Sequence, residues 1–244
     1  MRALLAGALL AFASAAIAAP SVYLEDLTSP ELRDQVRAGK TIVLVPIGGT
    51  EQNGPHMALG KHNTRARILA GRIATELGNA IVAPVMVYVP EGTIEPPAAH
   101  MKFPGTVTVP NDVFEKTLES AARSFRLHGF RDVVFLGDHG GYRTSLRAVA
   151  TRLNRMWAGT GTRVHALDEY YAAARIEGHA DRADTSLTLA LAPELVRADV
   201  VQATRPGAEG VQGDPRGANV EEGQRIAKAI VDGSVAAIRK AARR

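Results

Sequence analysis

The strongest constraint in the sequence is a regular alternation of short β-branched runs with longer amphipathic segments. Thr41–Ile47 reads TIVLVPI, an unbroken apolar run typical of a strand that is buried on both faces of a parallel sheet. Similar runs occupy Ala80–Val87, Arg131–Leu136 and Arg163–Leu167. This alternation predicts an α/β fold of three α/β/α layers, with a mainly parallel sheet and right-handed crossovers.

The segments between these runs carry the signatures of helices. Ser29 is expected to cap a helix that has Pro30 at its first position and runs to about Gly39. Two stretches, Gly48–Asn63 and Pro90–Pro110, are expected to be loops, and loops of such length are usually functional. Four further helices are expected to bury these apolar positions: Ile68, Leu69, Ile73 and Leu77; Phe114, Leu118, Ala121 and Phe125; Leu146, Val149, Leu153 and Trp157; and Ile226, Ile230 and Ile238.

The first 18 residues are expected to be a secretory signal and not part of the fold. Met1 and Arg2 precede the apolar, Ala-rich run Ala3–Ala19, which is short for a membrane span. Small residues at Ala16 and Ala18 predict cleavage after Ala18, with an uncleaved anchor as the alternative. Residues 19–244 are then expected to form a single domain in the periplasm or outside the cell, without stable membrane association.

Composition excludes several kinds of site. The chain has no cysteine, so disulfides, thiolate zinc sites and thiol nucleophiles are all excluded. Any metal must be held by histidine, carboxylate or neutral oxygen ligands. The formal net charge is only +4 and the basic residues are dispersed, whereas phosphate backbones are bound by clustered basic side chains. We therefore expect no nucleic-acid partner.

Polar, glycine-rich segments follow the predicted strands at three places. They are Gly48–Asn63, Gly137–Gly141 and Glu177–Ser186. Ligands of open α/β sheets bind beyond the carboxyl ends of the strands, which is where these segments fall. Together they contain four histidines and several carboxylates, a set that suits a metal site made of hard ligands.

Five short stretches occur in an order that is typical of one family. They are Glu51–His56, His100 with Phe103–Thr106, His128–Phe130, Asp138–Gly141, and Gly178–Ala180 with Asp184–Ser186. Within a region from about Thr41 to Val200, the chain thus resembles the creatininase (creatinine amidohydrolase) family. The resemblance implies a creatininase-like fold and hydrolysis of the C–N bond of a small cyclic or linear amide by metal-bound hydroxide. It also implies a homo-oligomer, often a hexamer, and commonly two metal ions.

The resemblance implies a set of metal ligands: Glu51, His62, His139 and Asp184. Glu51 and His139 match family ligands, whereas His62 stands where the family has a bridging Asp and Asn53 where it has a His. A neutral amide is a weaker ligand than imidazole, and no carboxylate is left to bridge two ions. We therefore expect one firm divalent ion, zinc first with manganese or iron as alternatives, and a doubtful second site.

His179 matches the family's catalytic histidine. We expect it to protonate the leaving nitrogen as a general acid, because imidazole titrates near neutral pH. Backbone amides of Gly48–Gly49 or Gly140–Gly141 are candidates to stabilise the oxyanion.

Four further residues are expected to contact the substrate or line its cavity: Asn53, His56, His100 and Arg175. In creatininases proper a Trp-Asp pair precedes the catalytic histidine, and this chain has Arg175 and Ile176 there. Creatinine is therefore not the expected substrate. A guanidinium at this position indicates a substrate that carries a carboxylate or phosphate.

Structural roles remain open for several of these residues. Asp184 is equally placed to cap a helix over Thr185–Ala192, and His62 to be a solvated loop residue. Asp138 either orients a ligating histidine or caps the helix after Tyr142. For the whole protein, the alternative is a catalytically silent relative that binds a small ligand or a partner. A hydrolase of another bond, such as a lactone, is a third candidate.

Overall fold

A four-stranded parallel sheet forms the centre of the molecule. The structure is a computed structural model that describes residues 21–243, so the predicted signal at residues 1–18 lies outside the described part. The strand order is β2-β1-β3-β4, and each neighbouring pair is parallel. Their bounds are Ile42–Ile47 for β1, Ala80–Val82 for β2, Asp132–Gly137 for β3 and Arg163–Ala166 for β4.

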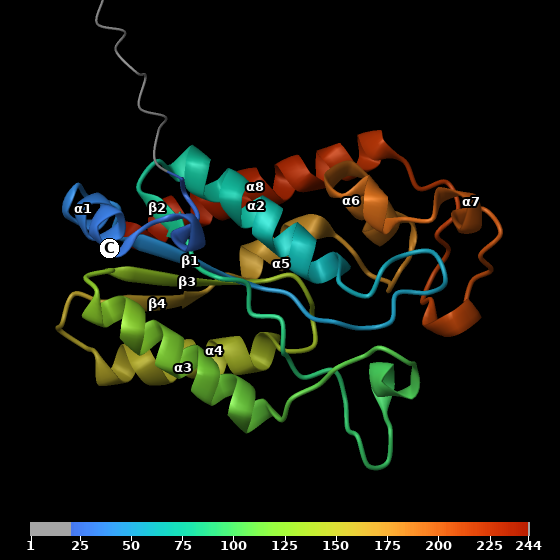
Figure 1. The fold of residues 1–244 in the computed structure, drawn as a ribbon, viewed down its shortest axis with the longest axis horizontal. Helices are drawn as coiled ribbons and strands as arrows, with labels where there is room; N and C mark the ends of the chain where they lie inside the picture. Colours follow the sequence, from blue (N-terminus) through green and yellow to red (C-terminus); the bar gives the residue numbers. More distant parts are fainter. Residues whose placement is uncertain (1–20, 244) are drawn as a thin grey trace, which may run out of the picture.

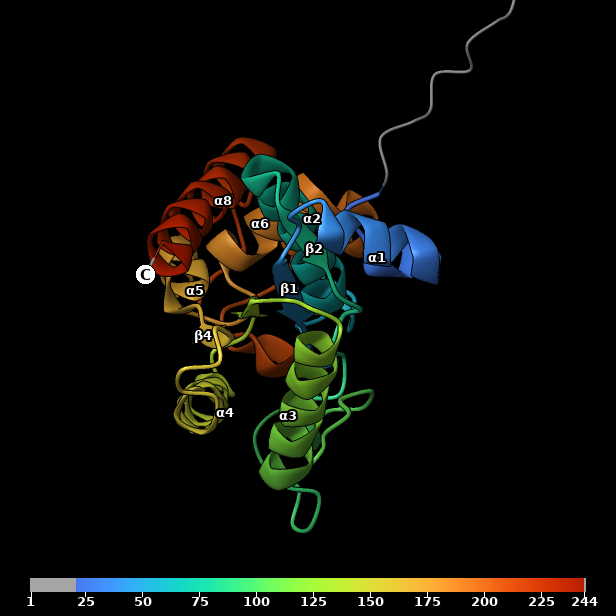
Figure 2. The same cartoon turned by 90° about the vertical axis from the view of Figure 1, so that its left-hand side faces the viewer.

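Helices cover both faces of this sheet, which confirms the predicted α/β/α layers (Figures 1 and 2). On one face lie α2 (Lys61–Leu77), α5 (Asp168–Ala174), α6 (Arg182–Leu191) and α8 (Val220–Ala242). On the other lie α3 (Asn111–Leu127) and α4 (Arg143–Met156). Figure 1 shows α1 (Ser29–Arg37) and α7 (Ala198–Val201) toward opposite ends of the molecule. Short 3-10 helices occupy Leu24–Asp26, Ala99–Lys102, Pro193–Leu195 and Ala208–Gly210.

The apolar runs are explained by burial on both faces of the sheet. In β1, Val43 and Val45 pack in the cluster that contains Phe114 of α3, while Leu44 packs in the cluster that contains Leu69 of α2 and Ile230 of α8. Successive side chains of a strand point to opposite faces, so a central strand between two helix layers must be apolar at every position. Every residue of β1 is buried.

The structure corrects several predicted element ends. β2 stops at Val82 instead of Val87, because Pro84 has no N–H for the ladder, and Met86 returns only as an isolated bridge to Ile47. The cap of α1 is Thr28, which forms a capping box with Glu31, and not Ser29.

Two corrections move functional residues. α2 begins at Lys61, so His62 lies in the first turn of a helix and not at the end of a loop. The cap of α6 is Asp181, whose side chain accepts a hydrogen bond from the Asp184 N–H at 2.9 Å. The alternative role of Asp184 as a helix cap is therefore wrong. In the described part of the chain, no helix is both long and apolar enough to cross a membrane.

The close packing of α6 against α8 can be tested at Gly223. A methyl group there would overlap the backbone carbonyl of Ser186, whereas at Gly233 of the same helix it would meet only Ala173 at 3.6 Å. We expect Gly223→Ala to lower the free energy of unfolding by about 1–3 kcal/mol, as overpacking does. Gly233→Ala should raise it by up to about 1 kcal/mol through helix propensity. Urea denaturation measures both, and equal effects would contradict this packing.

Candidate metal centre

Glu51 lies at the centre of a histidine cluster beyond the carboxyl ends of the strands. It follows β1, it is fully buried, and it receives side chains from four other segments. Its Oε1 lies 2.8 Å from Nε2 of His62 and 3.6 Å from Nδ1 of His179. Its Oε2 lies 3.2 Å from Nε2 of His100 and 3.7 Å from Nε2 of His139. The loops that the sequence predicts to converge do meet here.

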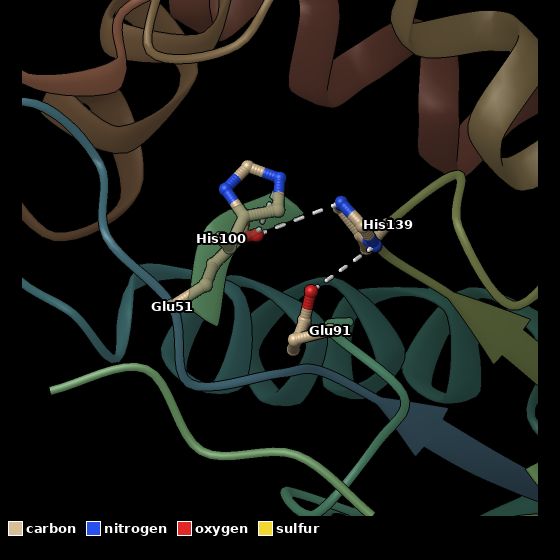
Figure 3. Close-up of side chains that lie close together, drawn as sticks. All are labelled: Glu51, Glu91, His100 and His139. Carbon is tan, nitrogen blue, oxygen red and sulfur yellow. Dashed lines mark ion pairs between the residues drawn. The ribbon is translucent and has the colours of Figure 1, made fainter. Parts of the chain in front are cut away.

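Four of the described residues form a group that is able to hold a metal ion: Glu51, Glu91, His100 and His139. Their ligand atoms all lie within 4.8 Å of one another. Figure 3 shows the ring of His139 beside both carboxylates, with its Nδ1 4.0 Å from Oε2 of Glu91. Glu91 was not predicted from the sequence. The only signal for it was its position in the long loop Pro90–Pro110.

The chemistry of this group fits a divalent cation. Oε2 of Glu51 and both carboxylate oxygens of Glu91 are buried, and no donor of the described chain is in hydrogen-bonding geometry with them. Burial, followed by the charge of Glu51, raises the pKa of Glu91 to about 9. Two buried carboxylates this close are stable in ionised form only with a cation between them. Two imidazoles and two carboxylates are ligands that zinc or manganese accepts.

His62 connects two carboxylates. Its Nε2 contacts Glu51, and its Nδ1 lies 2.6 Å from Oδ2 of Asp138 at the end of β3. Each ring nitrogen of His62 thus lies within hydrogen-bonding distance of a carboxylate oxygen. Burial alone would raise the pKa of Glu51, but the hydrogen bond from His62 and the nearby positive charges hold it well below its usual range. These contacts hold the carboxylate of Glu51 in place. The role of His62 as a metal ligand stays a prediction.

Asp184 forms an ion-pair network with two buried cations of α2. Its Oδ2 accepts hydrogen bonds from Nζ of Lys61 and from the N–H of Ala180, and its Oδ1 lies 2.5 Å from NH1 of Arg65. Arg65 also reaches Asp138, at 2.6 Å. Burial would raise the pKa of Asp184, but Lys61 and Arg65 hold it well below the ordinary value. Both carboxylate oxygens of Asp184 are therefore engaged by other groups of the protein. These contacts do not support the predicted role of Asp184 as a metal ligand.

A cavity of about 210 Å³ opens beside the cluster. His179 lines it and donates from Nε2 to the carbonyl of Gln52 at 2.8 Å, which leaves Nδ1 as the proton-accepting nitrogen. Burial, aided by the charge of Lys61, lowers the pKa of His179 to about 4. The free site therefore holds a neutral imidazole at neutral pH, and not the group titrating near pH 7 that the sequence suggested. His100, His139 and Gly140 also line the cavity.

The other predicted contact residues lie elsewhere. Asn53 is fully buried, and its amide donates to the carbonyls of Glu51 and Ala58. His56 is buried, with its Nε2 2.9 Å from Oγ1 of Thr185, and Arg175 is exposed. None of the three residues Asn53, His56 and Arg175 lines the cavity.

The two glycine pairs differ in their environment. The amides of Gly48 and Gly49 donate to the Met86 carbonyl and to the Asn63 side chain, so they are not free to bind an oxyanion. Gly140 lines the cavity. Of the two predicted pairs, only the one that contains Gly140 is placed to contact a ligand.

Comparison with known proteins agrees with this arrangement. The family described as Creatininase: Creatinine amidohydrolase matches residues 25–238. The chain belongs to the creatininase family. It is 30% identical over 236 residues to the mycofactocin precursor peptide peptidase of Mycolicibacterium smegmatis, covering 87% of this chain and 89% of that protein. The 3-dehydro-scyllo-inosose hydrolase of Thermotoga maritima is 25% identical over 202 residues, which cover 76% of this chain and 61% of that protein.

A solved structure extends the likeness to three dimensions. A mutant creatininase described as of Zn-Zn type superposes with a TM-score of 0.76 at 25% identity, over 91% of this chain and 98% of that chain. This solved creatininase thus shares the fold observed here, and the described residues of this chain hold a group that is able to bind a metal ion beyond the carboxyl ends of the strands.

The metal group can be tested by ion content. We expect His139→Ala and Glu91→Gln to weaken binding of Mn²⁺ or Zn²⁺ by at least about tenfold, because each removes one of few ligands. His128→Ala, at the exposed C-cap of α3, is the control and should leave binding unchanged. Elemental analysis after dialysis measures the ions per chain. A Glu91→Gln variant that binds the ion as tightly as the wild type would show that Glu91 is not a ligand.

The ion-pair network can be tested through stability. Asp184→Asn leaves the ammonium of Lys61 without its carboxylate in a buried site, so we expect a loss of about 3–5 kcal/mol in the free energy of unfolding. Asp214→Asn removes an exposed partner of Arg216 and should have no measurable effect. Urea denaturation of both variants decides the point. An Asp184→Asn protein as stable as the wild type would show that the buried pair is not needed.

Proposed function

We propose that the chain is a metal-dependent hydrolase of the C–N bond of an amide. The observation that carries the proposal is the group of Glu51, Glu91, His100 and His139 next to a cavity that His179 also lines. A divalent ion held there would polarise the amide carbonyl and lower the pKa of water that attacks it. The relatives named above include a peptidase and a hydrolase, which supports a hydrolytic reaction.

The protein side of the reaction centres on His179. Its Nε2 is held by the Gln52 carbonyl, so Nδ1 faces Oε1 of Glu51 at 3.6 Å with a lone pair available. A neutral imidazole in this orientation takes a proton from the attacking water at Nδ1. It then delivers this proton to the leaving nitrogen, which departs poorly unless protonated. His179 therefore acts as a base before it acts as the acid that the sequence analysis expected.

The cavity limits the part of the substrate that reaches the site. A volume of about 210 Å³ is below the range of about 300–1,000 Å³ that holds a drug-sized ligand. We therefore propose a small linear amide, or the end of a peptide chain, as the substrate. The 30% identity to a precursor peptide peptidase supports this class over cyclic creatinine.

Substitution of His179 tests the mechanism. His179→Gln keeps a donor for the Gln52 carbonyl but cannot transfer protons, so we expect kcat to fall by about 10²–10⁴-fold with little change in KM. The assay is a panel of short peptides, small linear amides, creatinine and esters, with Mn²⁺ or Zn²⁺ present.

Three results would contradict the proposal. They are a wild-type protein that binds ions but hydrolyses no amide, hydrolysis that survives full removal of metal by a chelator, and unchanged kcat in His179→Gln. His128→Gln, at the exposed C-cap of α3, is the matched control for loss of an imidazole.

A further inference from the structure

Lys61 is a buried cation in a position that local rules disfavour. It is the first residue of α2 and is fully buried. The start of a helix carries partial positive charge, so a lysine there is unfavourable unless an anion lies close. The first turn of α2 contains no acidic residue, and Gly60 caps it without a side-chain hydrogen bond. The compensating anion is Asp184, which α6 brings from a distant part of the chain.

Buried carboxylates outnumber the buried lysine and arginine side chains at this edge of the sheet. The described part of the chain buries four carboxylates there: Glu51, Glu91, Asp138 and Asp184. Two basic side chains lie among them, Lys61 and Arg65. Asp138 and Asp184 contact these two side chains, whereas Glu51 and Glu91 belong to the group that is able to hold a metal ion. The half-exposed Asp181 caps α6 and lies outside this count.

A second ion would need a further carboxylate that is free to bind it. Asp184, which the resemblance implies as a ligand, lines the cavity together with Lys61 but has both of its oxygens in use by Lys61, Arg65 and the Ala180 amide. A second ion could bind Asp184 only by displacing the Lys61 ammonium.

We propose that the Lys61 ammonium occupies Asp184 and thereby keeps a second metal ion from binding there, so that this chain binds a single divalent ion. Lys61 is then a positioning residue that sets the metal stoichiometry of the site. This inference rests on the metal site proposed above. The mutant creatininase described as of Zn-Zn type shows that a structure similar to this chain occurs with two ions.

The test is the number of Mn²⁺ ions bound per chain. We expect one in the wild type, measured by elemental analysis after gel filtration in excess Mn²⁺ and by calorimetric titration. Lys61→Ala removes the ammonium and opens space beside Asp184, so the count should rise to two. Lys61→Ala with Asp184→Asn opens the same space but also removes the carboxylate that Lys61→Ala frees, so its count should return to one. Lys116→Met, at an exposed lysine of α3, is the control and should bind one ion.

Thermal denaturation gives a second readout that does not need activity. Without added ion, Lys61→Ala should melt below the double variant, because Lys61→Ala leaves Asp184 without its ammonium partner, whereas the double variant removes both members of the pair. Added Mn²⁺ should raise the melting temperature of Lys61→Ala more than that of the wild type. If Lys61→Ala does not fold without ion, its rescue by Mn²⁺ and the folding of the double variant support the proposal, and failure of both contradicts it.

The failures of the two proposals are distinct. A wild type that binds two ions, or a folded Lys61→Ala that binds one, overturns the role of Lys61 and leaves the metal-dependent hydrolase standing. A wild type that binds no ion overturns both.

Discussion

The compensation of buried carboxylates by cations of α2 is the interaction on which the site depends. The carboxylates come from separate parts of the chain: the segments after β1 and β2, the segment after β3, and α6. The cations Lys61 and Arg65 lie one turn apart on α2, so a single face of this helix forms ion pairs with both Asp138 and Asp184. Breaking a buried pair leaves an uncompensated charge in a medium of low polarity. The same contacts that align α2 and α6 therefore also define the shape of the cavity.

The layers of the fold were predictable because burial on both faces leaves a simple pattern. The apolar runs of β1 and β3 have few alternatives in a chain of this composition, and the helices between them show regular apolar spacing. Element ends were less predictable, since they depend on single groups. Pro84 ends the pairing of β2, and the choice between Thr28 and Ser29 as a cap is made by the position of the Glu31 carboxylate. The periodic pattern of apolar residues does not show where such single groups end a helix or a strand.

The candidate site was predictable only where its residues belong to motifs. Glu51 and His139 stand in glycine-rich segments directly after strands, and they meet as expected. Glu91 and Lys61 stand alone in the sequence. A glutamate in a long loop and a lysine near a helix start both look like solvated surface residues. Only the folded chain shows that each is buried, one among the metal-binding group and the other against Asp184.

The departures from the family pattern all act in one direction. The resemblance implies a bridging carboxylate where this chain has His62 and an imidazole where it has Asn53, and the ammonium of Lys61 engages the carboxylate of Asp184. Each change either removes a ligand from a second ion or adds positive charge beside it. His62 nevertheless keeps hold of Glu51, because its two nitrogens join Glu51 to Asp138. The polar network thus fixes the orientation of Glu51 in the group that is able to hold a metal ion, while the proposed block to a second ion is a positive charge of the protein chain itself.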